Sequence, residues 1–312
     1  MNKEKYILTM DIGGTTFTSA LFDSDFNQVG MSMESYIQEY GSKPDLISGF
    51  ISQLKRLYSE HNISIEEIIG LGISAPGPLD SRKGLILETP NLTMLQNTNL
   101  AKLMESELGI PVKIENDANL FVWGEWYRHY RKESVITGLT LGSGLGVGVI
   151  INGKVFTGSH GMGAEYGISP VKWGVWEDEI SIEGIEKLSI IEFSKVKSPK
   201  ELYKMAEDGN VKAQNIWQEF GHKLGLVSSH LVNLLDPAVI TLGGGISKAF
   251  PYFKGSMEAV LSEYSPSFIY HSIKIKASKD QLNSTHLGAA MFIRQKIEVT
   301  INKLTTSELR IC

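Results

Sequence analysis

Apolar runs and helical spacings alternate along the first third of the chain. A short apolar run ends at a pair of glycines and alternating character resumes at once, a pattern typical of two strands joined by a tight turn. Leucine and phenylalanine residues then recur at spacings of three and four, which predicts an amphipathic helix. We expect strands over 6–12, 17–22, 28–36 and 68–74 and a helix over 44–61. The order of these elements is βββαβ.

The second half of the chain opens in the same way. An apolar run over 135–141 ends at a glycine-rich turn, and a β-branched stretch over 147–151 follows it. Two strand-glycine-strand openings indicate two related α/β halves. Elsewhere we expect helices over 99–108 and 116–130, a long helix carrying the apolar residues of 213–234, helices from about 247 and 283, and strands over 112–115, 238–242 and 273–277.

The length of the chain favours two domains. It has 312 residues, and typical domains contain roughly 100–200. We expect a small α/β lobe over 1–115, completed by a C-terminal helix over 284–300, a large α/β lobe over 116–283, and a tail over 301–312. The predicted fold class is α/β, with two lobes and a cleft between them.

Composition and charge argue against several classes of protein. The chain is 42% hydrophobic and 21% charged, as folded globular proteins are. Its formal net charge is -5, and no stretch of the sequence collects basic residues into a stripe that would bind nucleic acid. The N-terminus lacks the apolar core of a signal peptide, and no apolar run approaches the roughly 20 residues that span a bilayer. A single cysteine, Cys312, permits neither an intrachain disulfide nor a cysteine-based zinc cluster. We expect a cytoplasmic protein without nucleic-acid or membrane partners.

Two glycine-rich turns are candidates for phosphate binding. In DIGGTT, at 11–16, glycines would let backbone N–H groups approach an anion while the aspartate holds a cation beside it. GSGLG, at 142–146, would form a second such loop. Each turn alone fits an ordinary hairpin equally well, but two of them opening two α/β halves are much less expected by chance. A dinucleotide fingerprint over 142–148 is disfavoured because a strand follows it, and a Walker A loop over 148–154 because Val155 replaces the metal-binding Ser or Thr.

A polar cluster follows the strand predicted over 112–115. The sequence ENDAN, at 115–119, lies at a strand-to-helix junction, where backbone amides and the helix dipole favour an ionised carboxylate able to accept a hydroxyl proton. Helix capping is the alternative role for these residues. Glu165 lies in a glycine-bordered loop over 161–167, where the alternative is a solvated surface acid.

Seven motifs together resemble a known family. They are DIGGTT at 11–16, ISAPGPLD at 73–80, PNL at 90–92, ENDAN at 115–119, LGSGLGVG at 141–148, GAEYG at 163–167 and LGGGIS at 242–247. In this order they closely resemble the ROK family of sugar kinases and sugar-responsive repressors, over residues 6 to about 292. The resemblance implies the two-lobed, actin-like ATPase fold (ribonuclease H-like), with ATP and a sugar bound in the cleft.

The resemblance also implies roles for individual residues. It assigns ATP-phosphate binding to Asp11, Gly13, Gly14, Thr15, Thr16, Gly142, Ser143 and Gly144, and adenosine binding to Gly243, Gly244 and Gly245. It assigns the catalytic base to Asp117 and sugar binding to Asn91, Asn116, Asp117, Glu165 and Glu183. Mg²⁺ is expected near Asp11, held through water.

Residues 168–182 depart from the family pattern. The histidine that serves both sugar and zinc in the family is replaced by Ile168, and the three zinc-binding cysteines are missing, so we expect no structural zinc. The segment contains KWGVW at 172–176, which would either stabilise the loop by aromatic packing or line the sugar pocket. Packing is favoured, because buried tryptophans are commonly structural.

The function implied by the resemblance is ATP-dependent phosphorylation of the primary hydroxyl of a hexose or N-acyl-hexosamine by a homodimeric enzyme. Glucose is the first expected substrate, and N-acetylmannosamine is the second. A sugar-sensing transcriptional regulator is disfavoured because only ten residues precede Asp11, too few for a DNA-reading domain. A non-catalytic sugar-binding protein is disfavoured because the phosphate-loop residues and Asp117 are all present.

Overall fold

The structure, a computed structural model, describes residues 5–308, except for the side chains of Asn91 and of residues 299–308. The chain forms two compact units. Unit 1 comprises residues 1–120, 158–162 and 282–312, and unit 2 comprises residues 121–157 and 163–281. The chain therefore passes from one unit to the other after residues 120 and 281, where the sequence suggested 115 and 283. The assignment of 158–162 to unit 1 was not expected.

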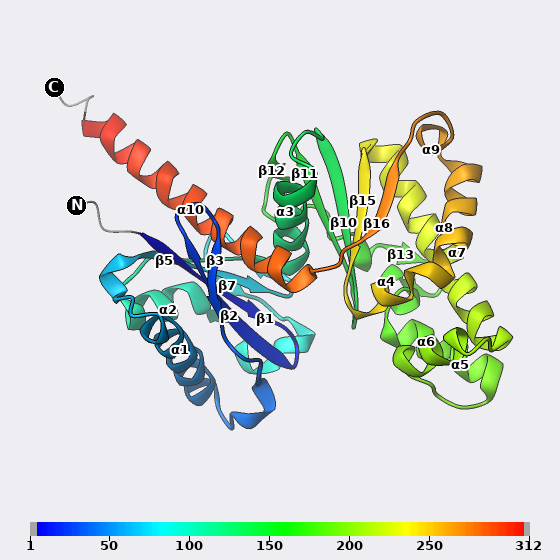
Figure 1. Cartoon of the computed structure of the whole chain (residues 1–312), viewed down its shortest axis with the longest axis horizontal. Helices are drawn as coiled ribbons and strands as arrows, with labels where there is room; N and C mark the ends of the chain where they lie inside the picture. Colours follow the sequence, from blue (N-terminus) through cyan, green and yellow to red (C-terminus); the bar gives the residue numbers. More distant parts are fainter. Residues whose placement is uncertain (1–4, 309–312) are drawn as a thin grey trace. The chain divides into compact units, whose positions relative to one another are not determined.

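Unit 1 is built on a six-stranded mixed sheet with the order β3-β2-β1-β5-β9, in which β4 also pairs with β2 (Figure 1). β1 lies antiparallel to β2 and parallel to β5, and β5 lies parallel to β9. The strands are β1 (Tyr6–Ile12), β2 (Thr16–Asp23), β3 (Gln28–Met31), β4 (Ser35–Tyr36), β5 (Ile68–Ala75) and β9 (Val112–Asn116).

The single strand expected over 28–36 is wrong, because β3 and β4 are separate. The interruption falls at Ser32, whose hydroxyl accepts a hydrogen bond from the Ser19 N–H at 2.9 Å. A serine side chain that bonds the backbone in this way competes with the sheet ladder.

Helices and a small second sheet complete the core of unit 1. The helices α1 (Lys43–Glu60) and α2 (Leu100–Leu108) bury apolar faces that join the core beneath the large sheet. The remaining elements are the strands β6 (Leu79–Asp80), β7 (Leu85–Ile86) and β8 (Thr98–Asn99) and the 3-10 segments η1 (Ile37–Glu39), η2 (Ile65–Glu67) and η3 (Pro90–Leu95).

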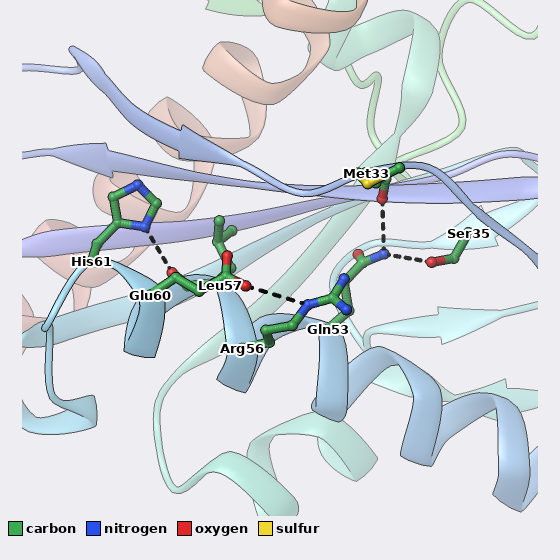
Figure 2. Close-up of polar contacts among 7 residues, drawn as sticks. All are labelled: Met33, Ser35, Gln53, Arg56, Leu57, Glu60 and His61. Atoms are coloured by element: carbon green, nitrogen blue, oxygen red, sulfur yellow. Dashed lines mark hydrogen bonds and ion pairs between the residues drawn. The ribbon is translucent and has the colours of Figure 1, made fainter.

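One buried polar side chain ties α1 to the strands of unit 1. Figure 2 shows Gln53 donating from Nε2 to the Met33 carbonyl oxygen at 3.3 Å and to the Ser35 hydroxyl at 2.9 Å. Its Oε1 accepts from the Ser19 hydroxyl at 2.6 Å. Because each polar atom of this amide is hydrogen-bonded, its burial does not leave an unpaired group in the core.

Unit 2 is built on a five-stranded mixed sheet with the order β12-β11-β10-β15-β16. Its strands are β10 (Val135–Leu141), β11 (Leu145–Ile151), β12 (Lys154–Val155), β15 (Val239–Gly243) and β16 (Lys274–Ala277), and a separate hairpin joins β13 (Pro170–Val171) to β14 (Gly174–Val175). The helices are α4 (Trp176–Glu179), α5 (Ile182–Phe193), α6 (Pro199–Glu207), α7 (Val211–Leu235), α8 (Phe250–Tyr264) and α9 (Pro266–Tyr270), with 3-10 segments η4 (Tyr166–Ile168) and η5 (Gly245–Ala249).

The two sheets share one topology. Each opens with an antiparallel hairpin closed by a glycine turn, and two further parallel strands follow on the side of the first strand. In each sheet, a helix also packs closely against a strand at a glycine. A Cβ atom on Gly72 of β5 would lie 2.2 Å from the Ala289 carbonyl oxygen, and one on Gly138 of β10 would lie 2.7 Å from the Val122 Cβ. The related halves indicated by the sequence are thus visible in the packing as well as in the strand order.

The two helices that make these contacts are α3 (Asp117–His129) and α10 (Gln281–Glu308), and both contain a passage between units. The expected final helix over 284–300 with a tail over 301–312 is wrong in extent, because α10 continues to Glu308. Residues 309–312 of that tail lie outside the described residues. No helix in the range 5–308 is both long and apolar enough to span a membrane.

A fully buried histidine of α10 bonds to the sheet of unit 1. His286 Nδ1 lies 2.9 Å from Thr9 Oγ1, and Nε2 lies 3.0 Å from Thr18 Oγ1. Thr9 donates its hydroxyl hydrogen to the Ala20 carbonyl oxygen, so it accepts from His286, and Nε2 is left to accept from Thr18. Burial lowers the pKa of His286 to about 3, which keeps the ring neutral.

Candidate functional site

In unit 1 the candidate residues gather at the carboxyl ends of three adjacent parallel strands. The strand register places Asp11 of β1 beside Ser74 of β5, and Ser74 beside Glu115 of β9. Asn116 ends β9 and Asp117 begins α3, one residue further along. The two motifs DIGGTT and ENDAN, which are far apart in the sequence, therefore meet at one edge of the sheet.

Asp11 is a half-buried carboxylate near the end of β1. Burial raises the pKa of Asp11 to about 6, and the hydroxyl of Ser74 opposes this shift. The turn that follows is closed by a hydrogen bond from the Gly13 N–H to the Thr16 carbonyl oxygen at 2.8 Å. Gly14 and Thr15 are exposed at its tip. The turn thus offers open backbone beside a half-buried acid, which suits a phosphate accompanied by a cation.

Hydrogen bonds hold the ENDAN segment in place. Glu115 is buried, and its Oε1 accepts from the Asn116 N–H at 2.8 Å and from the Asn119 side-chain amide at 3.2 Å. Burial raises the pKa of Glu115, and these two hydrogen bonds oppose the rise. Asn116 Oδ1 accepts from the N–H groups of Ala118 and Asn119, at 3.0 and 3.3 Å. Asn116 therefore caps α3, the alternative role considered from the sequence.

Asp117 is half-buried in the first turn of α3, and its Oδ1 accepts from the Ala118 N–H at 2.8 Å. Its position is fixed from both sides, by the capping of Asn116 and by the buried pair of Glu115 and Asn119. Nothing in the sequence points to Asn119 beyond its place in the motif. The side chain of Asn91, a predicted sugar-binding residue in η3, lies outside the described part of the structure.

In unit 2 the two candidate nucleotide loops end adjacent parallel strands. The turn of Gly142, Ser143 and Gly144 joins β10 to β11 and is closed by a hydrogen bond from the Gly142 N–H to the Gly144 carbonyl oxygen at 3.1 Å. Gly243 ends β15, beside Thr140 of β10. The two loops therefore lie at the same edge of the unit 2 sheet, as the two motifs of unit 1 do on theirs.

Only glycine fits at Gly244. Its φ angle is 86°, and a Cβ atom there would lie 2.0 Å from the Leu141 carbonyl oxygen. Its N–H donates to Gln281 Oε1, and a Cβ on Gly243 would lie 2.8 Å from the Phe121 ring. Phe121 and Gln281, which support this loop, were not predicted, because neither lies near LGGGIS in the sequence.

Glu165 is exposed in a loop anchored to β11. A Cβ on Gly167 would lie 2.2 Å from the Leu145 carbonyl oxygen, so the loop passes directly over the start of that strand. The next residue, Tyr166, places its hydroxyl 2.5 Å from His230 Nδ1 of α7. Burial raises the pKa of Tyr166. The loop is thus fixed on both sides of Glu165.

The segment in place of the family's zinc motif forms the β13–β14 hairpin and the single turn of α4. Trp176 is half-buried against the core of unit 2, and its ring meets His230 edge to face at 6.1 Å. The expectation of aromatic packing is confirmed for Trp176 and is wrong for Trp173, which is 81% exposed at the hairpin turn. Glu183 is the second residue of α5 and pairs with Lys187 at 3.0 Å, with its side chain exposed.

The donors available for a cation are few. In the described part of the chain, no three His, Cys, Asp or Glu side chains are grouped so that they could hold a metal ion. Mg²⁺ usually binds through one or two carboxylates together with the phosphates of a substrate, and not in an all-protein cage. Asp11 fits that role, since its poorly solvated carboxylate would gain from a cation beside it.

Comparison with known proteins identifies the family. A model of the ROK family matches residues 7–296. The chain belongs to the ROK family. It is 29% identical to a glucokinase of Thermotoga maritima over 93% of this chain and 98% of that protein, and 27% identical to an N-acetyl-D-glucosamine kinase of Photobacterium profundum over 76% and 83%.

The fold agrees with this membership. A ROK family glucokinase from Streptomyces griseus, solved in complex with glucose and AMPPNP, superposes with a TM-score of 0.76 at 22% identity, over 93% of this chain and 99% of that one. The chain therefore has the actin-like ATPase fold of the ROK sugar kinases, and the predicted fold class is confirmed.

Proposed function

We propose that this ROK protein is an ATP-dependent sugar kinase. The observation that carries the proposal is that candidate residues lie together at one edge of each sheet: Asp11 and Asp117 in unit 1, and two glycine loops in unit 2. A carboxylate poised to take a proton and open backbone turns suited to phosphate are the parts that phosphoryl transfer to an alcohol requires. The named relatives, a glucokinase and an N-acetylglucosamine kinase, support the same reaction class.

The assigned base is Asp117. It would accept the proton of the sugar's primary hydroxyl as that oxygen attacks the γ-phosphorus of ATP in line. The hydrogen bonds that position the start of α3 hold the Asp117 carboxylate for this task, so little reorganisation is needed when the sugar binds. Asn116 is already engaged in capping, so sugar binding by its side-chain amide would use the Nδ2 hydrogens.

The residues proposed to bind the nucleotide belong to the glycine loop of unit 1 and to the two glycine loops of unit 2. Gly13, Gly14, Thr15 and Thr16 in unit 1, and Gly142, Ser143 and Gly144 in unit 2, are the proposed phosphate contacts, and Gly243, Gly244 and Gly245 are the proposed adenosine contacts. When bound, Mg²⁺ would neutralise phosphate charge. Asp11 is the residue that would hold it, in keeping with the raised pKa of its carboxyl.

The proposed substrates are hexoses and N-acyl-hexosamines. Glucose comes first and N-acetylmannosamine second, with Glu165, Glu183 and Asn91 as further proposed sugar contacts. Ile168 is 61% exposed and apolar where the family motif has a histidine, so the side chain at this position cannot donate a hydrogen bond to a sugar hydroxyl. We therefore expect the preferred substrate to be a sugar that makes fewer polar contacts with this loop.

A coupled ADP-release assay tests the proposal. Purified protein with Mg-ATP is offered glucose, mannose, fructose, allose, N-acetylglucosamine and N-acetylmannosamine in turn. We expect sugar-dependent ADP release on at least one sugar, and Asp117→Asn should lower kcat by on the order of 10²–10⁴-fold, the usual contribution of a general base.

A control and a second readout accompany the assay. Asp25→Asn changes an exposed aspartate of unit 1 and should leave kcat unchanged. Sugar binding, followed as a shift in melting temperature, should persist in Asp117→Asn. Sugar binding without ADP release by the unmodified protein would contradict the kinase and favour a sugar sensor, and full turnover by Asp117→Asn would contradict the assignment of the base.

A further inference from the structure

An acidic side chain lies directly against the proposed phosphate loop of unit 2. A Cβ atom on Gly144 would lie 2.7 Å from Oε2 of Glu177, the second residue of α4. Glycine at position 144 therefore lets the carboxylate rest on the backbone of the turn. The segment that carries Glu177 stands where the family pattern has its zinc motif, so the family resemblance assigns this residue no role.

The short helix α4 is held firmly against that loop. The Ile182 N–H, just beyond α4, donates to the Gly142 carbonyl oxygen at 2.8 Å. Within α4, Asp178 accepts from the Val175 N–H at 2.9 Å, and Glu179 pairs with Lys223 of α7. These contacts fix the backbone from which the Glu177 side chain extends toward Gly144.

Glu177 differs from its acidic neighbours in lacking a partner. Asp178 and Glu179 are both engaged, whereas among residues 5–308 nothing forms a hydrogen bond or ion pair with the Glu177 carboxylate. An unneutralised carboxylate is an unfavourable neighbour for a phosphate group, because like charges a few ångströms apart repel and are only partly screened near a protein surface. The arrangement would weaken the binding of any anion that came to this loop without a cation.

We propose that Glu177 makes the nucleotide site selective for the magnesium complex of ADP or ATP over the metal-free nucleotide. This inference rests on the proposed kinase function and concerns its phosphate loop. A bound divalent cation offsets two of the charges on the phosphates. Glu177 would therefore repel the metal-free nucleotide more strongly than the magnesium complex. Only the complex with Mg²⁺ is competent for phosphoryl transfer, and Glu177 would therefore exclude an unproductive ligand.

Calorimetric titration with ADP tests this proposal without turnover. The dissociation constant is measured for the unmodified protein and for Glu177→Gln, once with excess Mg²⁺ and once with EDTA. We expect Glu177→Gln to bind metal-free ADP about tenfold more tightly, a change of about 1.4 kcal/mol, and to bind Mg-ADP no more tightly than the unmodified protein does. The preference for Mg-ADP should therefore fall by about tenfold.

Glu219→Gln provides a matched control. Glu219 is exposed on α7 in the same unit, and its replacement changes the net charge by the same amount. The preference of Glu219→Gln for Mg-ADP should equal that of the unmodified protein. If Glu177→Gln lacks the normal melting transition, Glu177→Ala takes its place in the comparison.

The outcomes separate this inference from the proposed function. ADP binding with an unchanged preference for the magnesium complex in the Glu177 variant would overturn the role of Glu177 and leave the kinase proposal standing. Failure of the unmodified protein to bind ADP in either buffer would overturn both.

Discussion

At the scale of single residues, the half-buried carboxyl of Asp11 makes stability depend on pH. Its pKa is raised from 3.8 to about 6 by burial, so folding takes up a proton between these values and the cost of the buried charge is fully present above pH 6. In metal-free buffer, Asp11→Asn should be more stable than the unmodified protein above pH 7, by up to about 3 kcal/mol, with the difference vanishing below pH 4.

Urea unfolding at several pH values measures this difference, and Asp25→Asn is again the control because its carboxyl is exposed. A difference between Asp11→Asn and the unmodified protein that stays constant from pH 4 to pH 8 would contradict a raised pKa at Asp11.

His286 has the opposite pH dependence. Its pKa is lowered from 6.5 to about 3, so its contribution to stability is complete above pH 6.5 and is lost as the pH falls toward 3. The total loss would be up to about 5 kcal/mol. His286→Gln should be less stable at neutral pH, because the bonds to Thr9 and Thr18 are disturbed, but its stability should fall less on acidification.

Unfolding free energies of both proteins between pH 4 and 7.5 test the role of His286. Parallel curves would show that the histidine does not titrate with folding. NMR titration of the imidazole is the companion measurement, and a native-state pKa near 6.5 would contradict the buried neutral ring.

At the scale of elements, Gly244 joins two strands that are distant in the sequence. Gly244→Ala would place a methyl group 2.0 Å from the Leu141 carbonyl oxygen in a backbone with φ of 86°, whereas a Cβ on Gly245 meets nothing within 4 Å. We expect Gly244→Ala to lower the free energy of unfolding by about 1–3 kcal/mol and Gly245→Ala to leave it nearly unchanged. Equal effects of the two replacements would contradict the close approach of the β15 loop to β10.

The elements most easily predicted were those with a strong apolar period. The strand-glycine-strand openings, α1 and the long α7 all follow directly from their apolar spacing. The break between β3 and β4 depends on one serine hydroxyl bonding across the sheet, and the short elements between 166 and 180 depend on contacts with α7. Interactions of these kinds leave no periodic signal in the sequence.

At the scale of the molecule, the sequence indicated two related halves but not where the chain passes from one unit to the other. The passages after residues 120 and 281 fall inside α3 and at the start of α10, where the helical pattern continues unbroken. The inclusion of 158–162 in unit 1 involves Arg82, which donates to the Ser159 carbonyl oxygen. A contact between exposed residues so distant in the sequence is invisible to pattern analysis.

The residues of the candidate site that lie within the sequence motifs could be predicted from the sequence. The order of motifs supplied Asp11, Asp117 and the glycine loops, because phosphate chemistry constrains those positions locally. The residues that support them, among them Ser74, Phe121 and Gln281, are ordinary in type and come together only through the folded sheets. The same holds for Glu177, whose place against Gly144 is a product of the α4 segment.

The central claim is the transfer of phosphate from ATP to the primary hydroxyl of a sugar, and phosphorus NMR of the reaction mixture tests it most directly. With Mg-ATP and the preferred sugar, a phosphomonoester resonance split by the protons of a methylene group should grow as the γ-phosphate signal falls, and Asp117→Asn should suppress it. Loss of γ-phosphate to inorganic phosphate alone, or an ester on a carbon bearing one proton, would contradict the account.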